Sequence, residues 1–322
     1  MRREPTVLIL THPFDPTADY VVEALHRRDI PVFRCDPGEF PKRLSLAASL
    51  YGAGWVGSLR LPEREVHLQD IGCAYYRRPT VFDLPDGMGD DVRRWASQEA
   101  RMGLGGVLSA LPRWLNHPSD IAAAEYKPVQ LAAARACALA VPHTLITNDR
   151  AAAVDFAHAV GKVVYKPLTP VNIADGDTQR VVFTTPVIAE LIDDSVAFTA
   201  HLFQEWIDKA YEVRLTVVDD GMFVTRLDAG TAAGAVDWRA DYDELTYTPL
   251  PGVPDAVRAG VIALMRRLRL RFGALDFAVT PDDDWVFLEV NPNGQWAWIE
   301  DATGQPIAGA IADALHRKVP PT

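Results

Sequence analysis

The sequence predicts an α/β (α+β) protein that combines a parallel sheet with antiparallel α+β units. Residues 6–10 form a continuous apolar run, and an amphipathic segment at 18–28 leads to a second apolar run at 31–35. This succession is a β-α-β pattern, which is typical of a parallel sheet. Near the other end of the chain, residues 273–293 form two apolar runs around an acidic turn, which predicts an antiparallel β-hairpin.

A change of composition near residues 116–118 separates a first segment from an alanine-rich second one. The first segment adds a hairpin at 44–61, a strand at 73–77 and a helix at 90–111, which we expect Gly103, Gly105 and Gly106 to interrupt. After the boundary we expect helices at 128–140, 149–160 and 254–270, strands at 143–147, 162–167, 180–184, 198–206, 211–218 and 222–228, and a polar loop at 168–178. We divide the chain into three domains, 1–115, 116–205 and 206–322.

Length and composition describe a folded enzyme-sized protein. A chain of 322 residues with 48% apolar content is expected to form two or three domains. No run approaches the roughly 18 apolar residues of a membrane span, and no cleavable signal pattern follows Met1, so we expect a cytoplasmic protein without a membrane partner. Cys35, Cys73 and Cys137 are odd in number and lack metal-ligand spacing, which fits buried or incidental thiols in a reducing compartment.

The charge balance argues against a nucleic-acid partner. The net charge is −11, whereas nonspecific binding to nucleic acid depends on Lys and Arg side chains that neutralise phosphates. Any cationic site must therefore be local.

The predicted C-terminal hairpin carries oxygen ligands on one face. Glu289 and Asn291 are two residues apart and therefore project from the same side of a strand. A turn at 281–284 would place Asp276 directly opposite Glu289. Two carboxylates and an amide suit Mg²⁺, which proteins commonly bind together with nucleotide phosphates. The alternative is a polar hairpin with solvated acids, which we accept for the aspartates of the turn. We favour the metal site for the other three because acids among apolar residues are seldom buried without a partner.

Two lysines occupy positions that suit phosphate binding. Lys166 ends the strand at 162–167, where an ammonium group at the rim of a sheet can meet phosphate oxygens. The alternative is an ordinary lysine whose charged end reaches water. Lys127 directly precedes Pro128 at a helix start, where the helix dipole mildly disfavours a cation. A phosphate held between the two lysines would explain both positions.

A second strand adds an acid and a cation on one face. Glu212 and Arg214 alternate along the strand at 211–218, so both side chains point the same way. A carboxylate can accept the hydroxyl groups of a ribose, and a guanidinium can grip phosphate or carboxylate. A plain surface salt bridge is the alternative. Arg226 and Arg239 add two more cations in the same half of the chain.

The order of these residues, together with Gln204-Glu205-Trp206-Ile207, resembles that of ATP-grasp ligases over residues 116–300. Three motifs narrow the resemblance: Tyr75-Tyr-Arg-Arg-Pro79, Ala124-Glu-Tyr-Lys-Pro-Val-Gln-Leu131 and Phe287-Leu-Glu-Val-Asn-Pro-Asn-Gly-Gln-Trp296. With them, the chain resembles the ATP-grasp maturases of ribosomally made peptides, the graspetide or microviridin-type macrocyclases. The resemblance implies an ATP-grasp fold, in which a pre-ATP-grasp domain at 1–115 precedes two subdomains, 116–205 and 206–322, that clasp ATP.

The resemblance also implies a role for each candidate residue. The nucleotide-binding residues would be Lys127 and Lys166 for the phosphates, Gln204, Glu205, Trp206 and Ile207 for the adenine, and Glu212 for the ribose. The Mg²⁺ ligands would be Asp276, Glu289 and Asn291. The catalytic residues, which stabilise the transferring phosphoryl group or the substrate carboxylate, would be Arg214, Arg226 and Arg239.

The implied activity is that of an ATP- and Mg²⁺-dependent ligase. It would activate Asp or Glu side chains of a precursor peptide as acyl phosphates and link them to Thr, Ser or Lys side chains as esters or amides. No Ser-His-Asp or Cys-His arrangement is visible, which agrees with the absence of a covalent enzyme intermediate. A homodimer is common in the resembling family. Two alternatives remain open: an amino-acid or glutamate ligase acting on a small molecule or a protein tail, and a nucleotide-sensing module without turnover.

Overall fold

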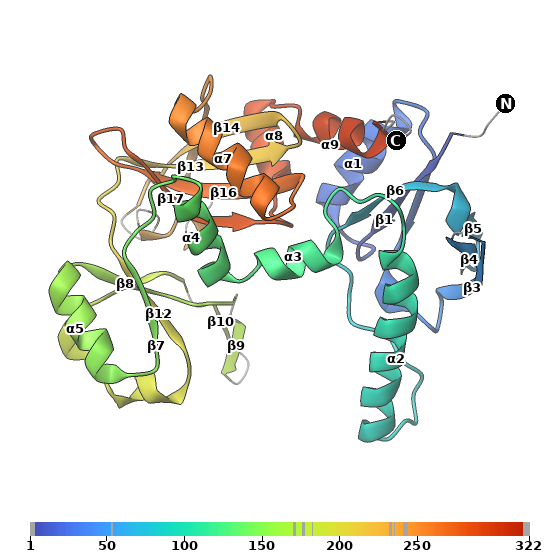
Figure 1. Ribbon diagram of the computed structural model, residues 1–322, viewed down its shortest axis with the longest axis horizontal. Helices are drawn as coiled ribbons and strands as arrows, with labels where there is room; N and C mark the ends of the chain where they lie inside the picture. The colour runs from blue at the N-terminus through green and yellow to red at the C-terminus, as the bar shows by residue number, and fades with distance from the viewer. Residues whose placement is uncertain are drawn as a thin grey trace.

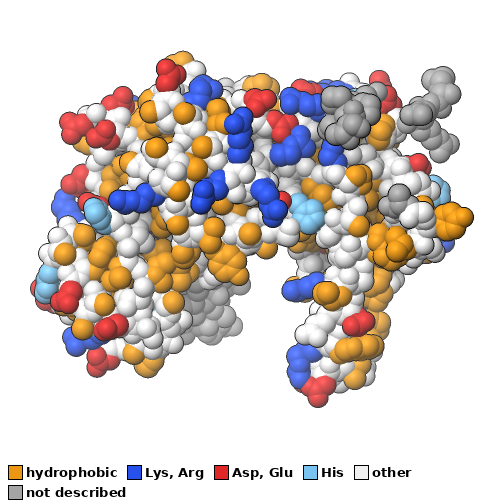
Figure 2. All heavy atoms as spheres, in the orientation of Figure 1, with side chains coloured by type: hydrophobic (Ala, Val, Ile, Leu, Met, Phe, Trp, Pro, Cys, Tyr) orange, Lys and Arg blue, Asp and Glu red, His pale blue; other side chains and the backbone are white. Residues whose placement is uncertain are grey.

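The computed structural model describes residues 4–52, 54–169, 172–175, 178–181, 183–231, 234, 236–240 and 244–317, with only the backbone of residues 172–175, 178–181 and 240. Its strands form a parallel sheet near the N-terminus, a central antiparallel sheet and a C-terminal antiparallel sheet, with two smaller sheets beside them. The C-terminal sheet lies above the central sheet, and the N-terminal parallel sheet lies to the right of the C-terminal sheet (Figure 1). The space-filling view shows an open notch between the central sheet and the helix at residues 90–109, which projects from the body of the protein (Figure 2).

The N-terminal parallel sheet confirms the predicted β-α-β opening. Its strand order is β2-β1-β6, and β1 pairs in parallel with both neighbours. Asp15 caps the helix between β1 and β2 by accepting a hydrogen bond from the Ala18 amide, and Pro16 occupies its first turn. The elements are β1 (Thr6–Leu10), α1 (Pro16–His26), β2 (Val32–Cys35), η1 (Pro37–Glu39) and β6 (Ile71–Tyr76). The hairpin predicted at 44–61 lies beside them within a three-stranded sheet of β3 (Ser45–Tyr51), β4 (Gly54–Leu61) and β5 (Arg64–His67), which η2 (Leu68–Asp70) follows.

The helix α2 (Asp90–Ser109) projects away from the body (Figure 1). It runs without a break through Gly103, Gly105 and Gly106, so the predicted interruption is wrong. A Cβ added at any of the three would meet nothing within 4 Å, so close packing does not explain these glycines either. The short α3 (Pro118–Ala124) and α4 (Lys127–Ala136) then cross to the other sheets, and each has a proline in its first turn.

The central sheet has the order β11-β8-β12-β7. Apolar residues of α5 and of the two 3₁₀ helices pack on one face around Val163 and Phe203. Its elements are β7 (Thr144–Thr147), α5 (Arg150–Val160), β8 (Val163–Lys166), β11 (Thr185–Val187), η3 (Ala189–Leu191), η4 (Asp194–Phe198) and β12 (His201–Glu205).

The loop predicted at 168–178 contains strand structure instead. β9 (Asn172–Asp175) pairs antiparallel with β10 (Thr178–Val181), and Asp175 lies opposite Thr178. The sequence between them is Gly-Asp, a dipeptide typical of two-residue hairpin connections, so the segment carries a hairpin signal within its polar composition. Pro170, Gly176 and Asp177 of the predicted loop lie outside the described residues.

The C-terminal sheet is antiparallel and has the order β15-β14-β13-β16-β17. Its strands are β13 (Tyr211–Val218), β14 (Gly221–Asp228), β15 (Thr246–Pro249), β16 (Phe272–Val279) and β17 (Trp285–Asn291). The other elements of this region are η5 (Trp238–Ala240), α7 (Asp255–Arg267), α8 (Ala297–Thr303) and α9 (Ile307–His316).

The two faces of the C-terminal sheet have different environments. Val213, Leu215 and Val217 of β13 point into an apolar core with residues of α4 and α7. The alternating residues Glu212 and Arg214 point to the opposite face, toward the central sheet, as the period of a strand requires. The first face therefore belongs to the apolar core, whereas the opposite face, which is also buried, combines polar groups with Val218 and Leu227 of a second apolar cluster.

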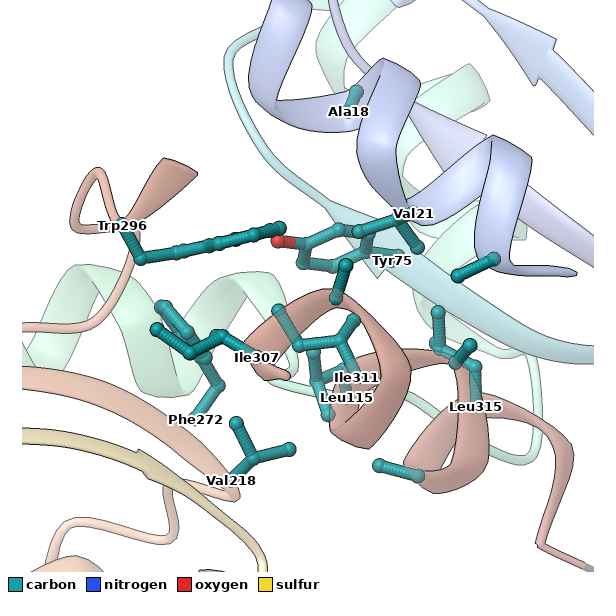
Figure 3. Close-up of a cluster of buried hydrophobic side chains, with 14 of the residues drawn as sticks. Ala18, Val21, Tyr75, Leu115, Val218, Phe272, Trp296, Ile307, Ile311 and Leu315 are labelled. Carbon is teal, nitrogen blue, oxygen red and sulfur yellow. The ribbon is translucent and has the colours of Figure 1, made fainter. Parts of the chain in front are cut away.

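The C-terminal helices tie the end of the chain to its beginning. α9 packs on α1 beside the N-terminal parallel sheet (Figure 1). Ile307, Ile311 and Leu315 of α9 join Val21 of α1 and Tyr75 of β6 in one buried cluster (Figure 3). Among the helices that the structure describes, none is long and apolar enough to cross a membrane. The α/β (α+β) fold class is confirmed.

Candidate active site

The hairpin of β16 and β17 places the two predicted acids opposite each other. Asp276 lies directly opposite Glu289, and Ala274 lies opposite Asn291. Both carboxylates are 3% exposed. The ladder shifts by one residue between Asp276 and Phe277 and then continues to the turn, so the pairs nearer the turn differ from the predicted register. The three oxygen-bearing side chains are grouped on these two strands, beside the shift.

Gln130 of α4 holds the edge strand β17 in place. Its side-chain amide donates to the Val290 carbonyl at 2.7 Å and accepts from the Val290 amide at 3.0 Å. It also donates to the Ala124 carbonyl at 2.7 Å. An edge strand has unpaired backbone groups, and Gln130 satisfies two of them between Glu289 and Asn291. Because Lys127 lies three residues before Gln130 on α4, the same contact brings its ammonium group to the site.

Each carboxylate of the predicted metal set is paired with cations. Lys127 donates to Glu289 Oε2 at 2.5 Å, and Arg239 donates to Glu289 Oε1 at 2.8 Å. The amide of Asn291 donates to the same Oε1 at 3.4 Å. Arg214 Nη1 lies 2.7 and 2.9 Å from the two oxygens of Asp276. The sequence predicts Lys127, Arg239 and Arg214 as ligands of phosphate or substrate. In the structure, they form ion pairs with Glu289 and Asp276.

Burial and pairing act in opposite directions on the two acids. Burial disfavours the ionised form of Glu289, but Lys127, Arg239 and Lys166 outweigh it and hold the pKa of this carboxyl well below its ordinary value. For Asp276 burial dominates and raises the pKa, although Arg214 acts in the opposite direction. Burial also lowers the pKa of Lys166, which is 9% exposed. Of the two acids, Glu289 is therefore the one whose surroundings favour the negatively charged form.

The donor set fits a hard divalent cation. Asp276, Glu289 and Asn291 supply only oxygen ligands from two carboxylates and one amide, as Mg²⁺ requires. Glu289 and Asn291 line a cleft of about 560 Å³ together with Lys127 and Lys166. Within the described ranges, no group of three or more His, Cys, Asp and Glu residues could hold a metal. A site with two carboxylates therefore needs ligands from elsewhere, such as phosphate oxygens, to complete its coordination.

A second pocket adjoins this cleft and contains the residues predicted to bind the nucleoside. Gln204, Glu205, Trp206 and Ile207 line it at the end of β12, and Lys166 and Glu212 belong to the same wall. The enclosed space is about 50 Å³, well below the roughly 300–1,000 Å³ of ligand pockets. Both pockets share Lys166 and Arg239, so the nucleoside pocket adjoins the cleft that Glu289 lines.

Glu212 is buried between the two sheets and has a partner of its own. Lys209 Nζ donates to Glu212 Oε1 at 2.5 Å and to the Val236 carbonyl at 3.3 Å. Burial raises the pKa of Glu212, and Lys209 partly offsets that effect. Lys209 also lines the nucleoside pocket. Sequence reasoning missed this lysine, although its position three residues before Glu212 was a readable signal.

The three predicted catalytic arginines do not lie together. Arg214 and Arg239 both approach the ring of Trp238, and each guanidinium carbon is 5.6 Å from its centroid. Arg226 lies opposite Val213 in the β13–β14 ladder and so projects from the other face of the sheet. There it pairs with Asp228 at 2.6 Å and stacks on Tyr211 at 4.1 Å. The structure therefore brings two of the three arginines to the acids.

Comparisons with known proteins agree with this geometry. A family model described as the MvdD pre-ATP grasp domain matches residues 6–122. No curated protein matches the chain. A RiPP-associated ATP-grasp ligase from Chryseobacterium gregarium, solved in complex with ADP and a leader and core peptide, is 28% identical with a TM-score of 0.91, and the match covers 98% of each chain.

Two macrocyclases from Microcystis aeruginosa are similarly close. MdnC, solved with the precursor peptide MdnA, is 30% identical with a TM-score of 0.84, and the match covers 96% of this chain and 99% of MdnC. MdnB is 29% identical with a TM-score of 0.80, and the match covers 97% and 99% of the two chains. This protein therefore belongs to the family of ATP-grasp peptide macrocyclases, as its motifs indicated.

Proposed function

We propose that this protein is an ADP-forming ligase that builds macrocyclic ester or amide links within a ribosomally made precursor peptide. The observation that carries the proposal is the convergence of Lys127, Arg239 and Arg214 on the facing acids Glu289 and Asp276, beside a cleft that Glu289 and all three cations line. The family membership supports it, because MdnC is a macrocyclase solved with its precursor peptide. The ligase from Chryseobacterium gregarium, which was solved with ADP and peptide, supports the use of ATP.

Each group in the cleft has a role in this proposal. Lys127 and Lys166 bind the phosphates of ATP, residues 204–207 line the adenine and Glu212 binds the ribose. Asp276, Glu289 and Asn291 hold Mg²⁺, which supplies positive charge beside the phosphates. Because Lys127 and Arg239 contact Glu289 in the structure, they must shift toward the phosphates when the nucleotide enters. The small nucleoside pocket must widen in the same step.

A carboxylate is a poor acyl donor because its leaving group would be oxide, so it must first be activated with phosphate. An Asp or Glu carboxylate of the peptide attacks the γ-phosphorus of ATP, ADP leaves, and the carboxylate becomes an acyl phosphate. Arg214 and Arg239 stabilise the charge on the transferring phosphoryl oxygens or orient the carboxylate. A Thr or Ser hydroxyl or a Lys amine then attacks the acyl carbon, loses its proton, and releases phosphate. Arg226 is left out of this proposal because it lies on the opposite face of the sheet.

Mass spectrometry tests the proposal directly. The purified protein is incubated with ATP, Mg²⁺ and a candidate precursor peptide rich in Thr and acidic residues, chosen from the genomic neighbourhood. We expect the peptide to lose the mass of one water for each link while ADP accumulates. A gain of mass on an acceptor would instead indicate an amino-acid or glutamate ligase. ATP binding without ADP release, with every acceptor, would indicate a nucleotide-sensing module.

Three further features belong to the same proposal. We propose the domain division 1–115, 116–205 and 206–322, which limited proteolysis tests, because the N-terminal, central and C-terminal sheets fall into these ranges. We also propose a homodimer, which light scattering after gel filtration tests.

We further propose that the protein acts in the cytoplasm. Its three cysteines are free thiols, and the proposed reaction needs ATP.

A further inference from the structure

A buried arginine of the N-terminal parallel sheet reaches toward the acids of the C-terminal sheet. Arg77 follows β6, and its side chain is 0% exposed. Its Nε donates to Asp15 Oδ2 at 3.1 Å, and Asp15 is 1% exposed. Burial of Asp15 works against its ionisation, but Arg77, together with hydrogen bonds from Thr11 and the Ala18 amide, outweighs that effect and lowers the pKa of the carboxyl. A buried pair of this kind is costly to break and therefore holds the guanidinium in one orientation.

Gln295 connects this arginine to the C-terminal sheet. Its side-chain oxygen accepts a hydrogen bond from Arg77 Nη2 at 2.9 Å and another from the Thr17 hydroxyl at 2.6 Å. The backbone carbonyl of Gln295 accepts from Arg214 Nη2 at 3.1 Å. The other end of the same guanidinium binds Asp276. A continuous chain of hydrogen bonds therefore runs from Asp15 to Asp276.

The segment that carries Gln295 has little freedom to adjust. A Cβ at Gly294 would lie 2.5 Å from the Ala274 side chain and 3.2 Å from Arg214 Nη2. Trp296 is 0% exposed, and its ring edge lies toward the hydroxyl of Tyr75 in the buried cluster (Figure 3). Glycine on one side and a buried tryptophan on the other thus fix where Gln295 sits. These contacts give a shared purpose to the Tyr75–Pro79 and Phe287–Trp296 motifs.

Arg214 depends on this support. Among the residues that the structure describes, its buried Nε has no hydrogen-bond partner, so its two terminal nitrogens set the orientation of the guanidinium. One of them binds Asp276, and the other binds the Gln295 carbonyl. Without the hydrogen bond to the Gln295 carbonyl, the guanidinium of Arg214 could rotate while it keeps its hydrogen bonds to Asp276.

We propose that Arg77 is a positioning residue of the ligase reaction, acting through Gln295 to fix Arg214 and thereby Asp276. The inference rests on the proposed function, because it assigns Asp276 and Arg214 to the metal and phosphoryl-transfer site. It makes the N-terminal parallel sheet part of the catalytic assembly rather than only a neighbour of it. A purely structural tie between the sheets is the competing explanation.

The decisive experiment combines kinetics with metal binding. Gln295→Met keeps the side-chain volume and the Arg77–Asp15 pair but removes the acceptor oxygen. We expect kcat to fall about tenfold or more, because small misplacements in an active site have effects of that size. The affinity for Mn²⁺ in the presence of ADP should fall as well, while KM for ATP changes little. Gln295→Glu keeps an acceptor oxygen and should restore most of kcat.

A double-mutant cycle separates positioning from a structural role. Gln295→Met combined with Arg214→Lys should be no slower than Arg214→Lys alone, because both changes disturb the same guanidinium. If Gln295→Met does not fold, Arg77→Lys replaces it in the cycle, because the lysine still gives Asp15 a cationic partner. Arg28→Met is the matched control: Arg28 also joins α1 to α9, through Asp313 at 2.9 Å, but belongs to no contact of the segment 291–296. Its kcat should equal that of the wild type.

Two results would overturn the inference. The first is a wild-type-like kcat and Mn²⁺ affinity in both Gln295→Met and Arg77→Lys. The second is a fully multiplicative effect of the paired substitutions, which is what a structural tie produces. Failure of the proposed function has a different signature, because the wild-type protein itself would then form no ADP with any precursor peptide.

Discussion

The contact between Gln130 and β17 allows a quantitative prediction. Gln130→Met has a similar length and helix propensity, so it removes three hydrogen bonds and little else. It leaves the amide and carbonyl of Val290 without their partner, and Val290 is 0% exposed. Each buried group without a partner costs about 1–3 kcal/mol. For the two groups together we therefore expect the free energy of unfolding to fall by about 2–6 kcal/mol.

Urea denaturation followed by tryptophan fluorescence measures this loss, because Trp285 lies on the same strand. The matched control is Gln98→Met, which changes an exposed residue of α2 and should shift stability by less than about 0.5 kcal/mol. Since Gln130 also positions α4, the variant should bind Mg-ADP more weakly than the control. A loss below about 0.5 kcal/mol in Gln130→Met would refute the argument that Gln130 holds the edge strand.

Three further predictions follow from the surroundings of the cleft. Burial lowers the pKa of Lys166 from 10.5, and phosphate would raise it again by favouring the charged form, so ADP binding at alkaline pH below 10.5 should take up protons. Calorimetry in buffers of different ionisation enthalpy measures this uptake, and Lys166→Met should abolish it; equal heats in all buffers would contradict it. Gly294→Ala should destabilise the protein by about 1–3 kcal/mol in thermal unfolding, because the new Cβ would overlap Ala274; an unchanged melting temperature would show that the segment can relax. Arg226→Gln should change ADP formation by less than about twofold, since a half-exposed ion pair contributes little, and a hundredfold loss would return Arg226 to the catalytic set.

Local patterns were sufficient to predict the centre of the site. The position of the acidic turn predicted Asp276 opposite Glu289, and the period of two predicted Glu289 and Asn291 on one side of the strand; the structure pairs Asp276 with Glu289. The same rule grouped Glu212 with Arg214. Residues 204–207, in contrast, were assigned to the adenine only through the family resemblance, and the structure places them around a pocket at the end of β12.

Other features depended on contacts that no local pattern encodes. Gln130 and Gln295 act on backbone and side-chain groups more than 150 residues away, so sequence spacing does not reveal them. Arg226 was misjudged because its face depends on the register between β13 and β14. The pairing of Val213 with Arg226 could have been inferred only from a two-residue turn at 219–220. Lys127 and Arg239, which contact Glu289, were predicted to have different roles, and neither was predicted to contact the acid itself.

The central claim is that Asp276, Glu289 and Asn291 bind a divalent cation. Measurement of Mn²⁺ binding in the presence of ADP tests this claim most directly. Electron paramagnetic resonance counts free Mn²⁺ during titration of the wild type, of Glu289→Gln and of the control Asp282→Asn, which changes an exposed acid of the hairpin turn. We expect wild type and control to bind Mn²⁺ equally, and Glu289→Gln to bind it at least about tenfold more weakly, because a neutral amide replaces a negatively charged ligand. Equal Mn²⁺ affinity in all three proteins would contradict the account.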